Sequence, residues 1–306
     1  MLYCPQENIW RMPMRYVLEN EILRVEIDSF GGELKSVKDK TTNQEYMWQG
    51  DPQFWGRTSP VLFPFVGSLK NKQYTYDGKT YNMGQHGFAR DMEHALVSKT
   101  ETEILFELIS TEETMQKYPF SFILNLGYAL EGNELKVIWK VTNNDAEKDL
   151  HFSIGAHPAF NCPIHGEENK AGYKFYFGGV DEIHHHGHTD AGLSVEEDFV
   201  LPLENHRATI TPEFFDGSTY IIEQPTTKEI GVEDPAGNRF VTVFFDMPIV
   251  ALWSPPGKNA PFLCIEPWFG RCDADDFEGT LEERAFNNTL KTEEKFETSY
   301  TIRFGA

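Results

Sequence analysis

Apolar residues recur at every second position along much of this chain, and this period of two limits its fold more than any other feature. The segment Leu23–Ile27 alternates apolar and charged side chains and soon meets two glycines, as a half-buried strand followed by a turn does. Residues 74–81 place Asp77 and Gly78 between two arms rich in tyrosine and threonine, which is typical of a β-hairpin. The sequence therefore predicts antiparallel strands joined by tight turns.

The strand pattern continues along the chain without a break that would mark a domain boundary. Segments 122–126 and 135–139 flank a Gly-Asn turn, and 239–245 is an apolar run that follows another. Only the windows 112–117 and 274–284 have helical character. An all-β chain of this size without a linker or repeat favours two packed sheets.

We therefore predict one large antiparallel β-sandwich domain with few short helices, over residues 14–306. Residues 1–13 lack the periodicity of the rest and are predicted to be an N-terminal extension.

The charge balance excludes two classes of partner. The chain has 48 Asp and Glu against 27 Lys and Arg, a net charge of -21, which repels nucleic acid and anionic membrane surfaces. No segment approaches the roughly 20 apolar residues of a membrane helix, and the first residues lack the apolar core of a signal peptide. The four cysteines lack paired spacing, so we expect reduced thiols and a cytoplasmic location.

Two segments place a basic side chain in a loop held by glycine or proline. Arg57 follows a Trp-Gly pair and precedes an apolar run that contains two prolines. Its planar guanidinium can bind hydroxyl groups or an oxyanion, or it can simply stack on a surface tryptophan. His86 follows Gln85 and precedes Gly87, so it can reach a ligand with little steric screening, although a histidine in a turn is often structural.

Two further segments place titratable groups at or in apolar strands. His157 follows an apolar strand and precedes a proline, a position suited to proton transfer, or to a buried hydrogen bond with a carbonyl. Glu266 follows four apolar residues and precedes Pro-Trp. A carboxylate there needs either a task or a paired arginine, and burial would raise its pKa into the range of a useful base.

A histidine run over residues 184–188, with acidic neighbours, has the composition of a metal site. It lies in a polar stretch with no predicted strand or helix to hold a geometry, so we expect a solvated loop that binds metal only adventitiously. Nucleotide-binding, zinc-protease and serine-nucleophile motifs do not occur in the sequence.

Together these segments resemble the aldose 1-epimerase (galactose mutarotase) family, in its bacterial branch associated with lactose operons. The resemblance runs from Tyr16 to Ile302 and is specific because four blocks occur in order. The blocks are FWGRTSPVLFPFVGSLKN, YDGKTYNMGQHGFAR, FSIGAHPAFNCP and LWSPPGKNAPFLCIEPWFG. It implies a galactose mutarotase-like supersandwich that binds a free sugar in an open cleft, without a metal or other cofactor.

The resemblance also implies roles for individual residues. His157 matches the general acid and Glu266 the general base, while His86 and Arg57 match positions that hold the ring oxygen and hydroxyls of the sugar. Trp253 is expected to contact the sugar as well. The family places an aspartate for hydroxyl binding where this sequence has Ser218, with Asp216 displaced toward the N-terminus. This departure leaves the preferred sugar open.

The predicted reaction interconverts the α and β anomers of an aldose such as galactose or glucose. One group removes the proton of the C1 hydroxyl while another protonates the ring oxygen, and we expect Glu266 to keep His157 protonated for that purpose. Three alternatives stay open: a hexose-6-phosphate 1-epimerase, which would need basic residues such as Arg57, Arg90 and Lys70 at the cleft; a non-catalytic sugar-binding or sugar-sensing protein; and a metal-dependent isomerase. The sequence does not indicate an oligomeric state.

Overall fold

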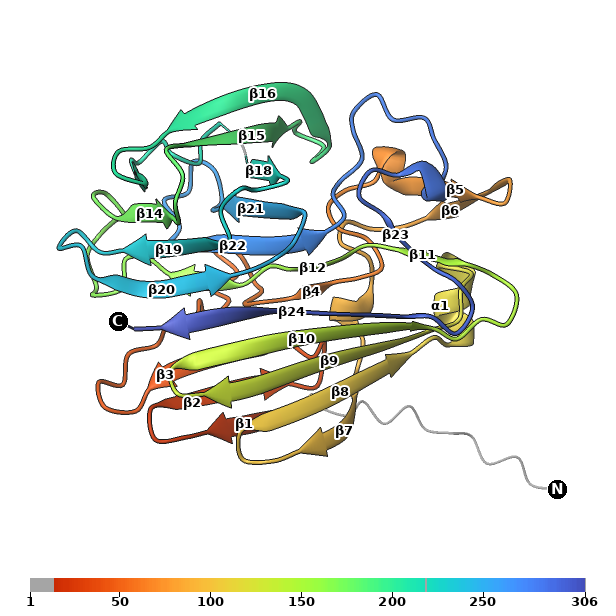
Figure 1. Ribbon diagram of the computed structural model, residues 1–306, viewed down its shortest axis with the longest axis horizontal. Coiled ribbons are helices and arrows are strands. Elements are labelled where there is room, and N and C mark those ends of the chain that lie inside the picture. Colours follow the sequence, from red (N-terminus) through yellow and green to blue (C-terminus); the bar gives the residue numbers. More distant parts are fainter. Residues whose placement is uncertain (1–13, 218, 306) are drawn as a thin grey trace.

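A computed structural model describes residues 14–217 and 219–305, and its architecture confirms the predicted antiparallel sandwich. The larger sheet of the described chain has nine strands, in the spatial order β17 (Arg207–Thr209), β14 (Lys174–Phe177), β19 (Glu229–Glu233), β20 (Arg239–Phe244), β24 (Lys295–Phe304), β10 (Glu134–Asn143), β9 (Phe122–Glu131), β8 (Glu103–Ile109) and β7 (Ala95–Lys99). Strands β24 to β7 cross the lower half of the molecule (Figure 1).

The second sheet carries Trp253 and Glu266, two of the residues singled out from the sequence. In the described chain it has eight strands, in the order β16 (Ser194–Pro202), β15 (Glu182–His188), β18 (Tyr220–Glu223), β21 (Ile249–Trp253), β22 (Phe262–Phe269), β12 (Ile154–Ala156) and β4 (Val61–Leu62), while β13 (Ala159–Asn161) also pairs with β22. Strands β16, β15, β18, β21 and β22 follow one another from the top of Figure 1 downward.

Smaller sheets complete the described part. They are β1 (Arg15–Glu19) with β2 (Leu23–Asp28) and β3 (Leu34–Asp39), the hairpin of β5 (Gln73–Tyr76) and β6 (Lys79–Asn82), and the pair β11 (Leu150–Phe152) and β23 (Asn288–Leu290). The hairpin predicted at the Asp-Gly turn is confirmed, with Tyr76 opposite Lys79. The predicted N-terminal extension lies outside the described residues.

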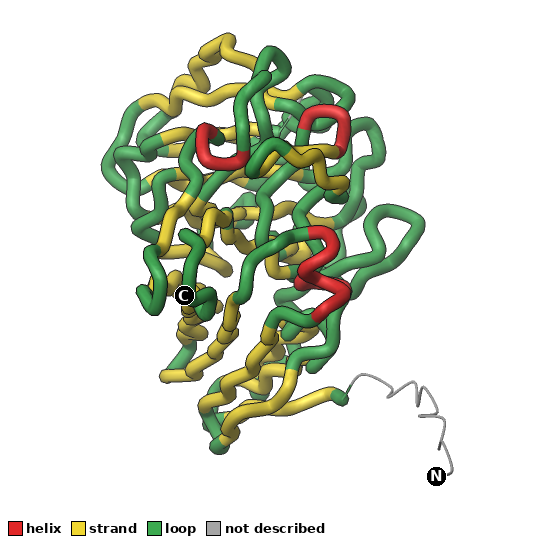
Figure 2. Tube along the Cα trace, turned by 90° about the vertical axis from the view of Figure 1, so that its right-hand side faces the viewer, coloured by secondary structure: helices red, strands yellow, loops and turns green. Residues whose placement is uncertain are grey.

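Helix is confined to short segments among strands and loops (Figure 2). The predicted helix over 112–117 is confirmed as α1 (Glu112–Lys117), and a capping box between Thr111 and Thr114 begins it. The helix predicted over 274–284 is wrong, because this segment forms only a single 3₁₀ turn at Leu281–Glu283. Its aspartates and Gly279 favour turns over helix, and its few apolar residues do not form a helical stripe.

The hydrophobic core lies between the sheets and follows from the alternation read in the sequence. Strand β2 alternates strictly between buried and half-buried residues, and β8 and β10 do so over most of their length. Large aromatic side chains fill the interior, among them Trp139, Phe63 and Phe122, each 2% exposed or less. The rings of Phe63 and Phe122 meet edge to face, with centroids 5.0 Å apart.

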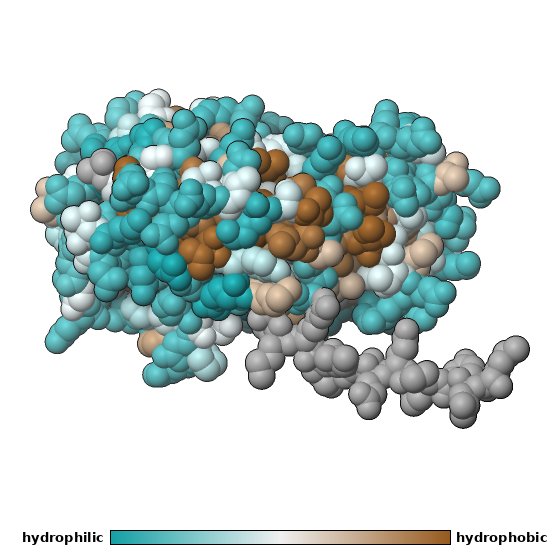
Figure 3. All heavy atoms as spheres, turned by 90° about the horizontal axis from the view of Figure 1, so that it is seen from below, coloured by the Kyte–Doolittle hydropathy of each residue, from teal (hydrophilic) through white to brown (hydrophobic). Residues whose placement is uncertain are grey.

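The outside of the molecule is mostly polar. On the face seen from below in Figure 3, hydrophilic residues dominate and apolar residues gather only near the middle. In the described residues no helix has the length and apolar character that a bilayer crossing requires. The cysteines of the described chain, Cys162, Cys264 and Cys272, are buried and form no disulfide, and Cys4 lies outside the described residues.

Candidate active site

Strand β22 is buried on both faces, and this places a carboxyl group at the centre of a sheet. Because side chains alternate along a strand, Leu263 and Ile265 pack in the main core, whereas Cys264 and Glu266 point to the opposite face. The neighbouring strand β21 runs antiparallel and sets Trp253 directly across from Cys264. The outer face of the eight-stranded sheet therefore carries a glutamate among aromatic residues.

His157 is brought to this glutamate by the end of strand β12. Gly155 pairs with Trp268, and the indole of Trp268 lies only 2.5 Å from where a Cβ on Gly155 would stand, so this position requires glycine. The indole Nε1 of Trp268 donates a hydrogen bond to the carbonyl of Ala156 at 3.1 Å. The next residue, His157, then lies with its Nε2 3.3 Å from Oε2 of Glu266.

Aromatic rings hold the His157 imidazole in place. Trp55 stacks on it, with centroids 4.6 Å apart and an interplanar angle of 28°. Trp253 meets the imidazole edge-on at 5.2 Å, and the ring of His86 does so at 5.7 Å. These contacts restrict the rotation of the imidazole and exclude water from it, as a site for proton transfer requires.

The hydrogen bonding of His86 defines which of its nitrogens carries a proton. The backbone N–H of Gly67 donates to Nδ1 of His86 at 3.0 Å, so a neutral imidazole carries its hydrogen on Nε2. The backbone at His86 is left-handed, with φ of 65°. The following residue, Gly87, has no room for a side chain, because a Cβ there would lie 2.3 Å from the carbonyl oxygen of Phe63.

Burial controls the protonation of the His157–Glu266 pair. It lowers the pKa of His157 to about 3, and the nearby guanidinium groups of Arg90 and Arg57 act in the same direction. Burial also raises the pKa of Glu266 well above its usual value, as predicted. The expectation that Glu266 keeps His157 protonated is therefore wrong, because both groups lose their hydration and the uncharged form of each is favoured.

A cavity of about 430 Å³ opens over this pair. Its walls combine aromatic rings with groups that can donate or accept hydrogen bonds. The side chains lining it include Trp55, Ser68, Gln85, His86, Arg90, His157, His188, Asp190, Thr219, Trp253, Glu266 and Trp268. Its size falls within the range of about 300–1,000 Å³ that is usual for small-molecule sites.

The structure brings four of the residues singled out from the sequence into this cavity wall: His86, His157, Trp253 and Glu266. Arg57 is not part of the lining, and its Nη2 instead donates to Asp91 Oδ1 at 2.8 Å.

The two predicted hydroxyl-binding positions near residue 217 have a different outcome. Asp216 is exposed and also lies outside the cavity lining, where it accepts a hydrogen bond from the backbone N–H of Gly257 at 2.9 Å. Ser218 lies outside the described residues, and the next residue, Thr219, lines the cavity.

Three residues of the cavity wall, Arg90, His188 and Asp190, are not among the site residues that the family resemblance implied. Arg90 stands in the same block as His86, and its Nη2 donates to the carbonyl of Gln85 at 2.7 Å. Burial lowers the pKa of Arg90 to about 10, with Arg57 contributing. His188 and Asp190 also line the cavity. The position of Arg90, four residues after His86 in a glycine-containing loop, was the signal that could have identified it.

The histidine run over residues 184–188 is not the solvated loop that we expected. It forms strand β15, which pairs with β16 and, at His186, with Ile221 of β18. β15 lies near the edge of its sheet, where several of its side chains face solvent, so its sequence lacks the apolar alternation by which a strand is recognised. His184 contacts Asp198 at 2.8 Å and Glu182 at 3.3 Å, whereas His188 reaches the cavity.

Comparison with known proteins identifies relatives over nearly the whole chain. The sequence profile of the family described as aldose 1-epimerase matches residues 14–278. Protein LacX of Lactococcus lactis subsp. lactis, in plasmid and chromosomal forms, is 31% identical over 279 residues, which cover 89% of this chain and 93% of the relative.

Solved structures agree with the sequence comparison. A galactose mutarotase related enzyme from Lactobacillus acidophilus superposes with a TM-score of 0.90 at 34% identity, covering 96% of this chain and 98% of the other. A galactose mutarotase-like protein from Lactobacillus casei superposes with a TM-score of 0.88 at 29% identity, covering 95% and 99%. The chain therefore belongs to the aldose 1-epimerase family, in its lactose-operon branch, and is an isomerase that acts on carbohydrates.

Proposed function

We propose that this protein is an aldose 1-epimerase that interconverts the α and β anomers of a free hexose such as galactose or glucose. The observation that carries the proposal is the buried contact of 3.3 Å between His157 and Glu266 in the wall of a cavity of about 430 Å³. Ring opening needs a proton removed from the C1 hydroxyl and a proton delivered to the ring oxygen. An adjacent imidazole and carboxyl group can carry out both proton transfers, and each transfer typically raises the rate about 10²–10⁴-fold.

In the proposed mechanism His157 is the general acid and Glu266 the general base. Glu266 takes the C1 hydroxyl proton while His157 protonates the ring oxygen, and the C1–ring oxygen bond breaks to leave an open-chain aldehyde. After rotation about the C1–C2 bond, the hydroxyl formed from the ring oxygen attacks C1 and returns its proton to His157. Glu266 protonates the carbonyl oxygen as the ring closes. No proton is gained or lost over the cycle.

The effect of burial on the two groups supports this sequence of steps. Ring opening converts a carboxylate and an imidazolium into a carboxyl group and a neutral imidazole, and burial favours that second state. The burial of the pair therefore lowers the free energy of the open-chain complex relative to the closed-ring one. The hydroxyls of a bound sugar replace lost water and allow the charged state to form before opening.

Other residues of the cavity are suited to holding a pyranose. We propose that His86 Nε2–H donates to a ring substituent, because its Nδ1 is already engaged by Gly67. Trp55 and Trp253 offer apolar surfaces against which the C–H faces of a sugar can pack. Arg57, Asp216 and Ser218 stay proposed hydroxyl-binding residues on the family resemblance alone.

A phosphorylated hexose is the second candidate substrate, because two arginines lie at one end of the site. Arg57 and Arg90 together line a hollow beside Trp55, next to the main cavity. Guanidinium groups bind phosphate well through paired hydrogen bonds. Lys70 adds nothing here, since its ammonium pairs with Glu278 at 2.5 Å and it does not line either space.

Polarimetry and NMR exchange spectroscopy test the proposal across a panel of sugars. We expect fast anomer exchange of galactose or glucose, in excess of the uncatalysed rate, with no added metal or cofactor. A clear preference for glucose 6-phosphate, abolished by Arg90→Gln, would select the second candidate. Saturable sugar binding without catalysed exchange for any aldose would contradict an epimerase and favour a sugar-binding protein.

A further inference from the structure

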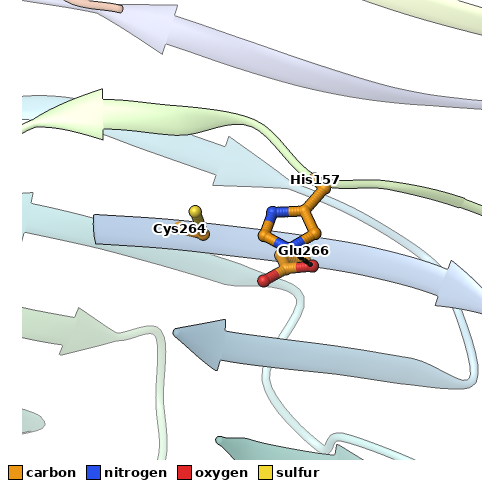
Figure 4. A group of neighbouring side chains, drawn as sticks. All are labelled: His157, Cys264 and Glu266. Carbon is orange, nitrogen blue, oxygen red and sulfur yellow. Dashed lines mark ion pairs between the residues drawn. The ribbon is translucent and has the colours of Figure 1, made fainter. Parts of the chain in front are cut away.

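The thiol of Cys264 lies beside the His157–Glu266 pair and has no part in the proposed reaction. Cys264 and Glu266 are two residues apart on β22 and project from the same face of the strand. One donor atom from each of the three residues lies within 4.8 Å of the others. Figure 4 shows the Cys264 sulfur to one side of the His157 ring, with one ring nitrogen turned toward it, and the Glu266 carboxylate at another edge of the ring.

Two polar atoms of this cluster are buried without a hydrogen-bond partner in the described residues. They are Nδ1 of His157 and Oε2 of Glu266, on residues that are 7% and 1% exposed. Oε2 of Glu266 contacts the other ring nitrogen, Nε2, at 3.3 Å, so Nδ1 is the ring atom left without any polar contact. Buried polar atoms nearly always find a partner, and leaving one without costs about 1–3 kcal/mol, which indicates a place where a bound species supplies a missing contact.

The three donors have a definite chemical preference. An imidazole nitrogen, a thiolate and a carboxylate together favour a borderline-soft divalent cation such as Zn²⁺ over Mg²⁺ or Ca²⁺, which prefer oxygen alone. Zinc bonds to these donors imply donor separations of about 3.5 Å in a tetrahedral site. In the structure the three donor atoms lie within 4.8 Å of one another, so binding requires the side chains to draw closer around the cation.

The surroundings leave one coordination position open toward the cavity. His157 and Glu266 line the cavity, whereas Cys264 lies behind them and is fully buried. A cation entering from the cavity therefore meets the histidine and the glutamate first. Three protein ligands and an open fourth position are the arrangement of an accessible zinc site.

We propose that His157, Cys264 and Glu266 form an inhibitory site for Zn²⁺ or a cation of the same class. Binding displaces the thiol proton of Cys264 and the carboxyl proton of Glu266 to solvent and engages a lone pair of His157. The cation then occupies the groups that would exchange protons with a sugar, so the metal-bound protein is inactive. The inhibition rests on the proposed function, but the binding of the cation does not.

The ammonium of Lys170 donates to the Ser254 hydroxyl at 3.3 Å and to the carbonyl of Ala260, so these hydrogen bonds go to groups other than the three donors. Because thiol and carboxyl ligands lose their protons when they bind a cation, zinc competes with protons at this site.

Co²⁺ titration of the tag-free full-length protein tests the site, because a Co²⁺–thiolate bond absorbs in the near ultraviolet and its visible bands report tetrahedral geometry. We expect one equivalent of Co²⁺ to produce both signals and Zn²⁺ to abolish them. Cys264→Ser should lose the thiolate band and raise the zinc concentration for half-inhibition about tenfold or more, with metal-free activity retained. Cys264→Ala serves as a second variant if the serine variant does not fold.

Two matched controls separate this site from others. Cys162→Ser changes a buried thiol outside the cavity and should leave the signals unchanged. His184→Asn removes a histidine of the exposed cluster and should also change nothing. The proposal is overturned if the wild type gives no thiolate band, or if Cys264→Ser keeps both the band and the inhibition. A Cys264-dependent band in a protein without epimerase activity would instead refute the proposed function and leave the metal site standing.

Discussion

Replacing Glu266 with glutamine should separate catalysis from folding more cleanly than any other change in the site. Glutamine has nearly the same volume and cannot take the C1 hydroxyl proton. The side chain of Glu266 is only 2% exposed, and burial raises the pKa of its carboxyl group well above the usual value, so burial favours the uncharged form. A neutral amide of nearly the same volume should therefore be tolerated there, and we expect the free energy of unfolding at neutral pH to change by no more than about 1 kcal/mol.

The expected loss of activity follows from the role of the carboxyl group. Removing a general base costs about 10²–10⁴-fold in rate, which corresponds to about 3–5 kcal/mol in the activation barrier. Glutamine can donate its amide hydrogen across the 3.3 Å gap to His157 Nε2, so the imidazole should keep its position. We therefore expect kcat to fall with little change in KM.

Glu233→Gln is the matched control, because Glu233 is a buried carboxylate on the other large sheet. It accepts hydrogen bonds from Arg207 at 2.7 Å and 3.1 Å and from Arg239 at 3.1 Å. Losing its charge should cost about 2–3 kcal/mol of stability, less than a fully buried pair because the arginine side chains are 34% and 30% exposed. Its specific activity should not change.

The assays are polarimetry of freshly dissolved α-galactose or α-glucose and urea unfolding at neutral pH. The two variants should behave in opposite ways, one inactive and stable, the other active and less stable. If Glu266→Gln retains more than about a tenth of the wild-type rate, proton transfer by this carboxyl group is refuted. A large loss of stability in Glu266→Gln would refute the inference that burial favours the uncharged form of this group.

Three further changes test other parts of the structure. Burial lowers the pKa of His94 to about 4, so the folded chain binds fewer protons than the unfolded chain between pH 6.5 and 4. The stability that this group contributes above pH 6.5 should therefore be lost as the pH falls, by about 3 kcal/mol. A plot of urea midpoint against pH should accordingly have a shallower slope in His94→Leu. Trp55→Leu removes the ring stacked on His157 and should lower kcat/KM about 2–10-fold by polarimetry, whereas an unchanged value would exclude a role for that stacking. Trp139→Ala leaves a cavity at a buried position near the middle of β10 and should lower the free energy of unfolding in urea by about 3–5 kcal/mol. The activity per folded molecule should not change.

Strand positions were predictable because strand periodicity is a local property. Alternation around Leu23 and the Asp-Gly turn at Asp77 determine backbone geometry within a few residues, and both were found where expected. The failures have local causes too. The histidine strand β15 carries too few apolar side chains to reveal its period, because much of it faces solvent near a sheet edge. The segment 274–284 was read as helix from charges that favour turns equally well.

The chemical identity of the site was also available from the sequence, through the order of its four blocks. His86, His157, Trp253 and Glu266 stand in those blocks and meet in one cavity. Arg90 stands in one of them as well, but sequence alone could not rank it above Arg57. The choice depends on which guanidinium faces the cavity, and a salt bridge to Asp91 draws Arg57 aside.

The sequence by itself thus determined the sandwich and the family, and it singled out the pair of groups that we propose exchange protons. Only the tertiary structure decided in which direction the pKa of each group shifts, because the shifts depend on how much water reaches His157 and Glu266. Hydration is lost through contacts with Trp55, Trp253 and the rest of the sheet, which lie far apart along the chain. The same packing places Cys264 beside His157 and Glu266. The alternation of β22 predicts that Cys264 and Glu266 share a face, but it does not indicate which distant histidine packs against that face.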